Sequence, residues 1–306
     1  MSRKAYRNSR WYRSLRWLRR AVEALLQALL MGIFWLLPVD WASALGGWVT
    51  RQIGTRLPTS RRALKHLAIA FPEMPESERR RIVAAMWDNL GRMIAEYPHL
   101  GAIADPAAGR MEVVGAERLA AVRAAGKPFI VISAHMANFE LMPIAAYKHG
   151  HNLTVVSRPV NNPFIQRILL FFRQRPTGDW GKIPKGVDGA RQAIRLLQQG
   201  LNLGVLVDQR VSQGVALPLF GRPARTNLGI AKLALDFDIQ IFPAHLERLG
   251  GARFRLTVEE PVAHSSLEDK QEAAKAMMTE VNKILERWIR QRPADWLWLH
   301  RRWDRP

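Results

Sequence analysis

The chain of 306 residues contains no cysteine. This absence excludes disulfide bridges, cysteine nucleophiles and thiolate metal ligands, and it fits a reducing compartment. Acidic residues are also scarce, because 26 Asp and Glu stand against 46 Lys and Arg and leave a formal net charge of +20. Such an excess indicates an anionic partner, for which nucleic acid, anionic lipid and an acidic carrier protein are the candidates.

The sequence also lacks an uninterrupted apolar run of the roughly 20 residues that a membrane-spanning helix needs. The best candidate, Ala21 to Leu37, is interrupted by Glu23 and Gln27 and is closed by a proline without a convincing signal-peptide cleavage site. Apolar character resumes immediately afterwards, up to residue 49. We therefore predict that residues 21–49 form a membrane anchor or an interfacial helical hairpin. A buried core helix with a solvated basic tail is the alternative.

Basic segments flank this region on both sides. Residues 1–20 contain eight Arg and Lys residues and no acid, and five more follow between residues 51 and 65. Positive charge on both flanks gives no clear orientation under the positive-inside rule. Anionic headgroups would attract both flanks, which favours a segment that lies in the membrane interface. We predict a basic, membrane-anchoring segment over residues 1–50 and a catalytic domain over residues 51–306.

Strand-like and helical patterns alternate beyond residue 50. The segment Pro128–Ala134 (PFIVISA) is typical of a buried strand, and Glu76–Tyr97 has apolar residues at helical spacing. Further strands are expected at 153–157, 201–207, 239–245 and 254–258, and further helices at 141–149, 163–174, 189–199, 228–235 and 268–290. The alternation predicts an α/β fold with a mixed, mainly parallel central sheet flanked by helices.

A histidine and an acid follow the PFIVISA strand in the segment HMANFE, residues 135–140. Catalytic groups of open α/β sheets gather at the carboxyl ends of strands. Residues five apart on one helix point about 140° away from each other, so His135 and Glu140 can meet only if His135 precedes the helix. In that geometry His135 would be a general base oriented by Glu140. A structural pair is the alternative, and no two-histidine metal spacing appears nearby.

The HMANFE segment resembles the H-x-x-N-x-E form of the H-x-x-x-x-D/E block in the lauroyl- and myristoyltransferases of lipid A biosynthesis, within the glycerolipid acyltransferase superfamily. Three more blocks resemble that family in the same order. They are residues 61–97, the R-P-x-x-N-P block that begins at Arg158, and the D-Q-x and P-x-F-G blocks between Asp208 and Gly221. The chain departs from the family pattern at His66, Met136 and Leu219, which leaves the identity of the acyl chain open.

The resemblance implies an O-acyltransferase at the cytoplasmic face of a bacterial inner membrane. It would move a fatty acyl chain from acyl carrier protein, or from a coenzyme A thioester, to a hydroxyl of a lipid A precursor, without a metal or another cofactor. His135 would take the hydroxyl proton and Glu140 would orient it. The matching positions assign substrate binding to Arg158, Asp208, Gln209, Arg210 and Gly221. An ion pair for Arg158 or Asp208, and an ordinary turn for Gly221, are the alternatives.

Two other functions stay open at this point. An acyltransferase of the same superfamily could act on a phosphatidylinositol mannoside, an ornithine lipid or a lysophospholipid. A nucleic-acid-binding protein would explain the basic, aromatic amino terminus, but no zinc-finger, RNP or helix-turn-helix signature appears, so we expect no nucleic acid partner. The apolar stripe between Phe164 and Phe172 could line an acyl channel, enter the membrane or pack in the core.

Overall fold

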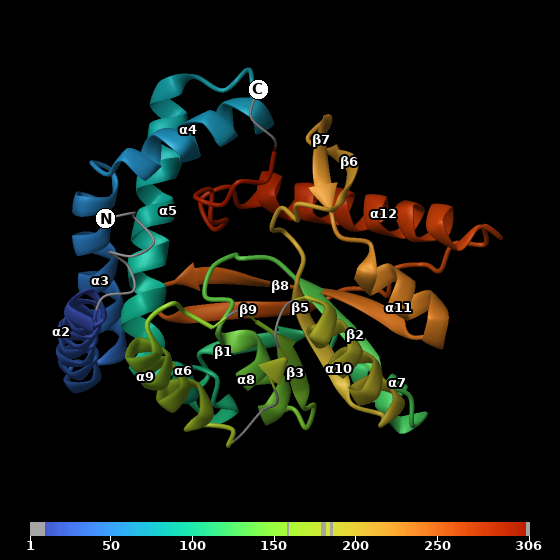
Figure 1. Ribbon diagram of the computed structural model, residues 1–306, viewed down its shortest axis with the longest axis horizontal. Helices are drawn as coiled ribbons and strands as arrows, with labels where there is room; N and C mark the ends of the chain where they lie inside the picture. Colours follow the sequence, from blue (N-terminus) through green and yellow to red (C-terminus); the bar gives the residue numbers. More distant parts are fainter. Residues whose placement is uncertain (1–9, 158, 179–181, 184–185, 304–306) are drawn as a thin grey trace.

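The computed structural model describes residues 10–157, 159–178, 182–183 and 186–303. Its centre is a seven-stranded sheet in the order β1-β9-β8-β2-β5-β3-β4 (Figure 1). The strands are β1 (Met111–Val114), β2 (Phe129–Ser133), β3 (Leu153–Val156), β4 (Lys182–Ile183), β5 (Asn202–Leu206), β8 (Gln240–Gly250) and β9 (Arg253–Val258). In this sheet only the hairpin pair β8–β9 is antiparallel. The predicted α/β fold with a mixed, mainly parallel sheet is therefore confirmed.

Helices cover both faces of this sheet (Figure 1). They are α7 (Ala116–Ala124), α8 (Leu141–Lys148), α10 (Val187–Gln198), α11 (Gly229–Phe237) and α12 (Lys270–Gln291). All five residues of β2 are buried, and alternate side chains point to opposite faces. Ile130 and Ile132 pack in the core beneath α10, α11 and α12, whereas Phe129 and Val131 pack in the core that α7 and α8 cover. This strand therefore needs apolar residues at every position, which explains the PFIVISA run.

The amino-terminal part of the chain is helical. It contains α2 (Arg10–Leu36), α3 (Val39–Gly54), α4 (Pro58–Ala70) and α5 (Glu76–Glu96), followed by the short helices η1 (Tyr97–His99), α6 (Leu100–Ile103) and η2 (Pro106–Ala108). The helices α2 and α3 cover the predicted segment, and Pro38 is the N-cap of α3. Figure 1 shows α2 end-on beside the upright α3, so the two helices cross and do not form the antiparallel hairpin that was one of the two predictions. Helix α2 begins earlier than predicted, within the arginine-rich segment. In the described part of the chain, no helix is both long and apolar enough to cross a bilayer.

Helix α3 packs tightly along α5. A Cβ atom on Gly46 would lie 2.6 Å from the carbonyl oxygen of Gly91, and a Cβ on Gly91 would lie 2.1 Å from that of Gly46. Any larger residue at these two positions would push the helices apart. The predicted boundary at residue 50 lies inside α3, and the side chains of Met31, Phe34 and Ala42 belong to the same core as β2.

A small ribbon that packs on α12, on the side away from the central sheet in Figure 1, was not predicted. Its strands β6 (Val215–Leu219) and β7 (Arg222–Thr226) pair with each other, and Pro218 faces Pro223. Phe220 and Gly221 connect them with φ angles of +52° and +67°. Two consecutive positive φ values are typical of the tight turn that joins antiparallel strands. The prolines hide these strands in the sequence, because proline is depleted in strands and occurs mainly at sheet edges.

Candidate active site

The backbone register of β2 and β5 brings His135 and Asp208 together. The two strands pair in parallel, with Ser133 opposite Leu206. His135 and Asp208 each lie two residues beyond that pair, so the carboxyl ends of neighbouring strands deliver them to the same place. Asp208 accepts hydrogen bonds from both Nδ1 and the backbone N–H of His135, at 2.7 and 2.9 Å.

The Asp208 carboxylate fixes the proton arrangement of the histidine. Burial by itself would raise the pKa of Asp208, but the nearby His135 ring, with its two hydrogen bonds, and the Trp296 indole outweigh it and hold that pKa well below its usual range. The Trp296 Nε1–H donates to Oδ2 at 2.8 Å. An ionised carboxylate only accepts hydrogen bonds, so Nδ1 carries the proton and the lone pair is at Nε2. His135 is therefore arranged as a general base.

Two further residues face the basic nitrogen of His135. The Gln209 amide nitrogen lies 3.1 Å from His135 Nε2 and 3.4 Å from His300 Nε2. The two imidazole rings are 4.9 Å apart between centroids. Gln209 was predicted as a substrate-binding residue, whereas His300 and Trp296 were not predicted, because they come from the irregular carboxyl-terminal segment that folds back over the strand ends.

Glu140 does not orient His135. Its carboxylate instead accepts a hydrogen bond of 2.6 Å from Arg173 Nε and forms an ion pair with the same guanidinium, whose Nη2 also lies 3.0 Å from the Tyr97 hydroxyl. Burial would lower the pKa of Arg173, but Glu140 and Tyr97 raise it above its usual range. The predicted pairing of His135 with Glu140 is therefore wrong. The carboxylate that pairs with His135 and orients it is Asp208.

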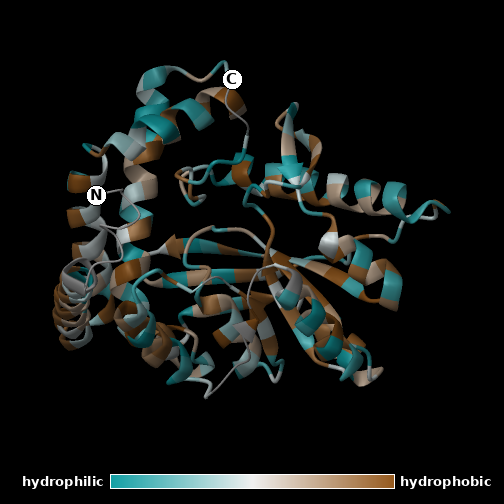
Figure 2. Ribbon diagram, in the orientation of Figure 1, coloured by the Kyte–Doolittle hydropathy of each residue, from teal (hydrophilic) through white to brown (hydrophobic). Residues whose placement is uncertain are grey.

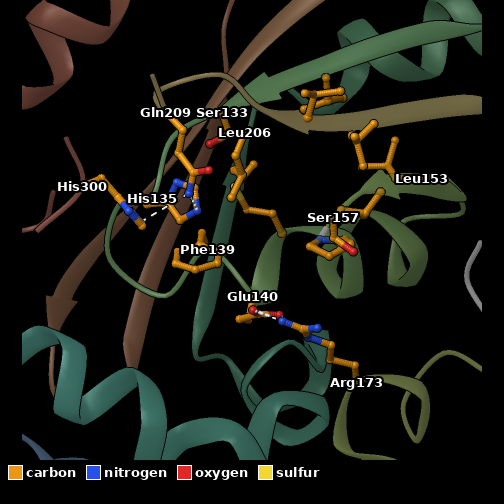
Figure 3. A pocket seen from close by; sticks show the side chains of 17 residues that line it. Ser133, His135, Phe139, Glu140, Leu153, Ser157, Arg173, Leu206, Gln209 and His300 are labelled. Atoms are coloured by element: carbon orange, nitrogen blue, oxygen red, sulfur yellow. Dashed lines mark hydrogen bonds and ion pairs between the residues drawn. The ribbon is translucent and has the colours of Figure 1, made fainter. Parts of the chain in front are cut away.

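The backbone of the HMANFE loop explains this correction. Ala137 has a φ of +46°, an unfavourable angle for a residue with a side chain, and the following helix α8 begins only at Leu141. The loop turns there, and Glu140 points toward α9 (Pro163–Gln174) rather than toward the end of β5. Figure 3 shows Glu140 and Arg173 together, apart from the group of His135, Gln209 and His300.

Buried hydrogen bonds hold this loop in place. The backbone N–H of Ala137 donates to the Asp295 carbonyl at 3.0 Å, and the Asn138 amide donates to Glu96 at 2.8 Å. Glu96 is fully buried and also accepts from Ser43 on α3 and from Arg248 on β8. The loop that carries His135 is therefore tied to α5, α3 and the central sheet together.

His135 lies at the polar end of a pocket of about 460 Å³ (Figure 3). Ser133, Gln209 and His300 line the same end, and Leu153 lies on the opposite side in Figure 3. The remaining lining is mainly apolar and comes from β2, β3, β5, α8 and the loop before α8, as Val131, Phe139, Met142, Pro143, Val155, Val156, Gly204, Val205 and Leu206. Ser157 and the ion pair of Glu140 with Arg173 also line the pocket. A long apolar group can therefore lie along the sheet with its polar end at His135.

Two of the remaining predicted site residues are not part of this pocket. Arg210 is exposed, Gly221 forms the β6–β7 turn, and among the described residues neither belongs to the pocket lining. Arg158 is outside the described residues. The apolar stripe of α9 packs toward α2 instead of lining the pocket, because Phe164 contacts Trp17 and Phe172 contacts Trp35.

These features define an α/β enzyme that uses an oriented histidine base at one end of an apolar pocket. The profile of the family described as "Bacterial lipid A biosynthesis acyltransferase" matches residues 10–305. The chain is 26% identical over 289 residues to the Escherichia coli (strain K12) lipid A biosynthesis lauroyltransferase, with 89% of both chains covered. It is 24% identical over 286 residues to a Haemophilus influenzae lipid A biosynthesis acyltransferase, with 88% of this chain and 85% of that protein covered.

The family match spans nearly the whole chain and agrees with the resemblance of its four sequence blocks. The chain belongs to the bacterial lipid A biosynthesis acyltransferase family, and the protein is therefore an acyltransferase.

Proposed function

We propose that this protein transfers a fatty acyl chain from acyl carrier protein to a hydroxyl group of a lipid A precursor, at the cytoplasmic face of a bacterial inner membrane. The observation that carries the proposal is the pairing of His135 with Asp208 at the polar end of an apolar pocket. The acyl chain fits the apolar part, and its thioester carbonyl then lies beside the basic Nε2 atom.

The reaction follows from this arrangement. His135 Nε2 takes the proton of the acceptor hydroxyl while that oxygen attacks the thioester carbonyl. The new C–O bond forms, the C–S bond breaks, and the departing thiolate takes the proton from the imidazolium. Asp208 stabilises the imidazolium, and general acid–base assistance of this kind contributes roughly 10²–10⁴-fold in rate. The Gln209 amide, at 3.1 Å from Nε2, lies where it can donate a hydrogen bond to the reacting oxygen.

The charge of the protein supports an acidic donor. A net charge of +20 favours association with acyl carrier protein, which is acidic, and also with the phosphates of a coenzyme A thioester. The two donors differ in how strongly salt should reduce transfer, because a carrier protein contacts a larger charged surface. Acyl thioesters are cytoplasmic, so the domain with His135 would face the cytoplasm.

The helices α2 and α3 support membrane association. Among the residues whose burial the structure describes, 25 large hydrophobic residues are exposed, and 17 of them lie between Leu15 and Leu57, in and just after α2 and α3 (Figure 2). Four of them are tryptophans, with exposed fractions of 48% for Trp17, 46% for Trp35, 71% for Trp41 and 60% for Trp48. Indole rings favour the headgroup region, and the flanking arginines would bind anionic lipid. If α2 lies in the plane of the membrane interface, the active site is near its lipid acceptor.

The direct test is transfer by the purified protein from acyl carrier protein thioesters to a lipid A precursor in mixed micelles, followed by mass spectrometry. We expect one added acyl chain, and we expect His135→Ala to abolish it while circular dichroism and urea unfolding stay close to wild type. Parallel reactions with a lysophospholipid and with a coenzyme A thioester test the other acceptor and donor. Wild-type transfer by a folded His135→Ala protein would refute the mechanism.

A further inference from the structure

A second cavity lies behind the apolar end of the active-site pocket. It is small, about 30 Å³, and almost wholly apolar. Three residues line both spaces, namely Val131 from β2, Met142 from α8 and Leu153 from β3. Each is more than nine-tenths buried. These three side chains separate the two cavities, and we call them the pocket wall.

The pocket wall lies along the path that an acyl chain would follow from His135. Successive residues on one face of a strand are two apart, so Val131 and Ser133 share the face that leads toward His135. At about 3.3 Å per residue, Val131 is roughly 13 Å from His135 along the strand direction. An extended chain advances about 1.2 Å per bond, so the wall stands roughly ten carbons from the carbonyl.

The second cavity continues in the same direction. Met142 is followed on α8 by Ala145 and Ala146 and, just after the end of the helix, by His149, and all three line the second cavity. The rest of its lining is Val113, Ala116, Leu119, His151, Ala244, Leu256 and Val258. Alanine leaves space that a larger side chain would fill, so the space beyond Met142 is limited mainly by the wall itself.

We propose that Met142, supported by Val131 and Leu153, stops the acyl chain and thereby sets the longest chain that the enzyme accepts. This inference rests on the proposed acyl transfer and adds its chain-length determinant. Of the three wall residues, Met142 can be replaced by a shorter residue with the least effect on the fold, because it is unbranched and lies on a short helix beside two cavities. Val131 and Leu153, in contrast, belong to the central sheet.

Opening the wall should change selectivity by a measurable amount. Each additional buried methylene contributes about 0.8 kcal/mol, which corresponds to about a fourfold change in binding. Met142→Ala removes three heavy atoms and joins the two cavities. Two further carbons can then be buried, and the ratio of kcat/KM for the longer thioester over the wild-type optimum should rise by about 15-fold.

The experiment measures kcat/KM for a series of saturated acyl carrier protein thioesters with wild type, Met142→Ala and Leu153→Ala, which opens the same wall from β3. The double variant Met142→Ala/Ala146→Leu refills the second cavity and should restore the wild-type preference. Met277→Ala is the matched control, because Met277 is equally buried but belongs to the core beneath α12. This control should lose stability without a change in preference.

The outcomes separate the two proposals. A longer preferred chain in Met142→Ala or Leu153→Ala, reversed by Ala146→Leu, supports the wall. A folded Met142→Ala protein that transfers acyl chains with the wild-type ratio overturns it and leaves the proposed function intact. A wild-type protein that transfers no acyl chain from any thioester contradicts the proposed function itself.

Discussion

The carboxylate that faces His135 is one strand away from it, not five residues further along the chain. Asp208 touches both the ring and the backbone of His135, whereas Glu140 is neutralised by Arg173. Both acids line or support the same site, but they act on different parts of it. Asp208 controls the protonation of the base, and Glu140 holds α9 against the start of α8.

This difference predicts a split between two isosteric variants. Asp208→Asn loses the negative charge that fixes the Nδ1 proton, so kcat should fall by about 10³–10⁴-fold with little change in KM, as for the equivalent change in serine protease triads. Glu140→Gln leaves His135 and Asp208 paired, and its main effect should be on stability, because breaking one side of a buried ion pair costs about 3–5 kcal/mol. The measurements are steady-state kinetics and urea unfolding. The reverse pattern, with Asp208→Asn active and a folded Glu140→Gln inactive, would return the orienting role to Glu140.

The low pKa of Asp208 also predicts how stability depends on pH. Because the folded-state pKa is depressed, the ionised carboxylate stabilises the protein above the unfolded pKa near 3.9, and this contribution is lost as the pH falls through the folded value. The stability advantage of wild type over Asp208→Asn should therefore be constant near neutrality and should shrink from about pH 5 downward. The urea unfolding midpoints of wild type and Asp208→Asn, measured across this pH range, test the prediction. The control Asp188→Asn, at an exposed position, should show no such convergence.

At the scale of helices and strands, the sequence predicted elements with a regular apolar pattern. The bounds of α5 and α9 agree with the predicted helices to within one residue at each end. The ribbon β6–β7 was missed because its strands contain prolines. The apolar pattern of β2 predicted that His135 lies at the end of a strand. Its partner Asp208 depends on the pairing of β2 with β5, and the periodicity of the sequence does not show which strands pair. His300 and Trp296 depended on the path of an irregular segment, for which no local pattern exists.

The contact between α3 and α5 predicts opposite effects for two Gly→Ala variants. Gly91→Ala places a methyl group 2.1 Å from the Gly46 carbonyl, so the two helices must separate, and overpacking of this kind costs about 1–3 kcal/mol or more. Gly32→Ala on α2 meets nothing within 4 Å, and the better helix propensity should stabilise the protein by up to about 1 kcal/mol. Thermal or urea unfolding measures both. Equal effects at the two positions would contradict the close packing of α3 on α5.

At the scale of the whole molecule, most of the exposed large apolar residues in the described part of the chain lie on α2 and α3. We expect Leu25→Ser and Leu29→Ser, at exposed positions of α2, to leave stability within about 0.5 kcal/mol. Each should weaken binding to anionic vesicles by about tenfold, because burying a leucine contributes about 1.5–3 kcal/mol. Leu267→Ser is the control, since Leu267 is 54% exposed but lies far from α2 and α3 in sequence, before α12. Vesicle sedimentation measures the binding. Equal loss in all three variants would mean that α2 is not the membrane-binding surface.

The register between β2 and β5 has a consequence for how this enzyme can diversify. His135 and Asp208 are 73 residues apart, and the intervening segment forms α8, β3, α9, β4 and α10. The backbone ladder of two adjacent strands holds the pair, so an insertion or deletion in the connections around α9 and α10 does not move it. The connection before α9 reaches the pocket through Ser157 and reaches α2 through Asn162, whose amide donates to the Arg20 carbonyl. Loop lengths can therefore vary between descendants of this chain, and with them the acceptor, while the proton-transfer chemistry is inherited unchanged.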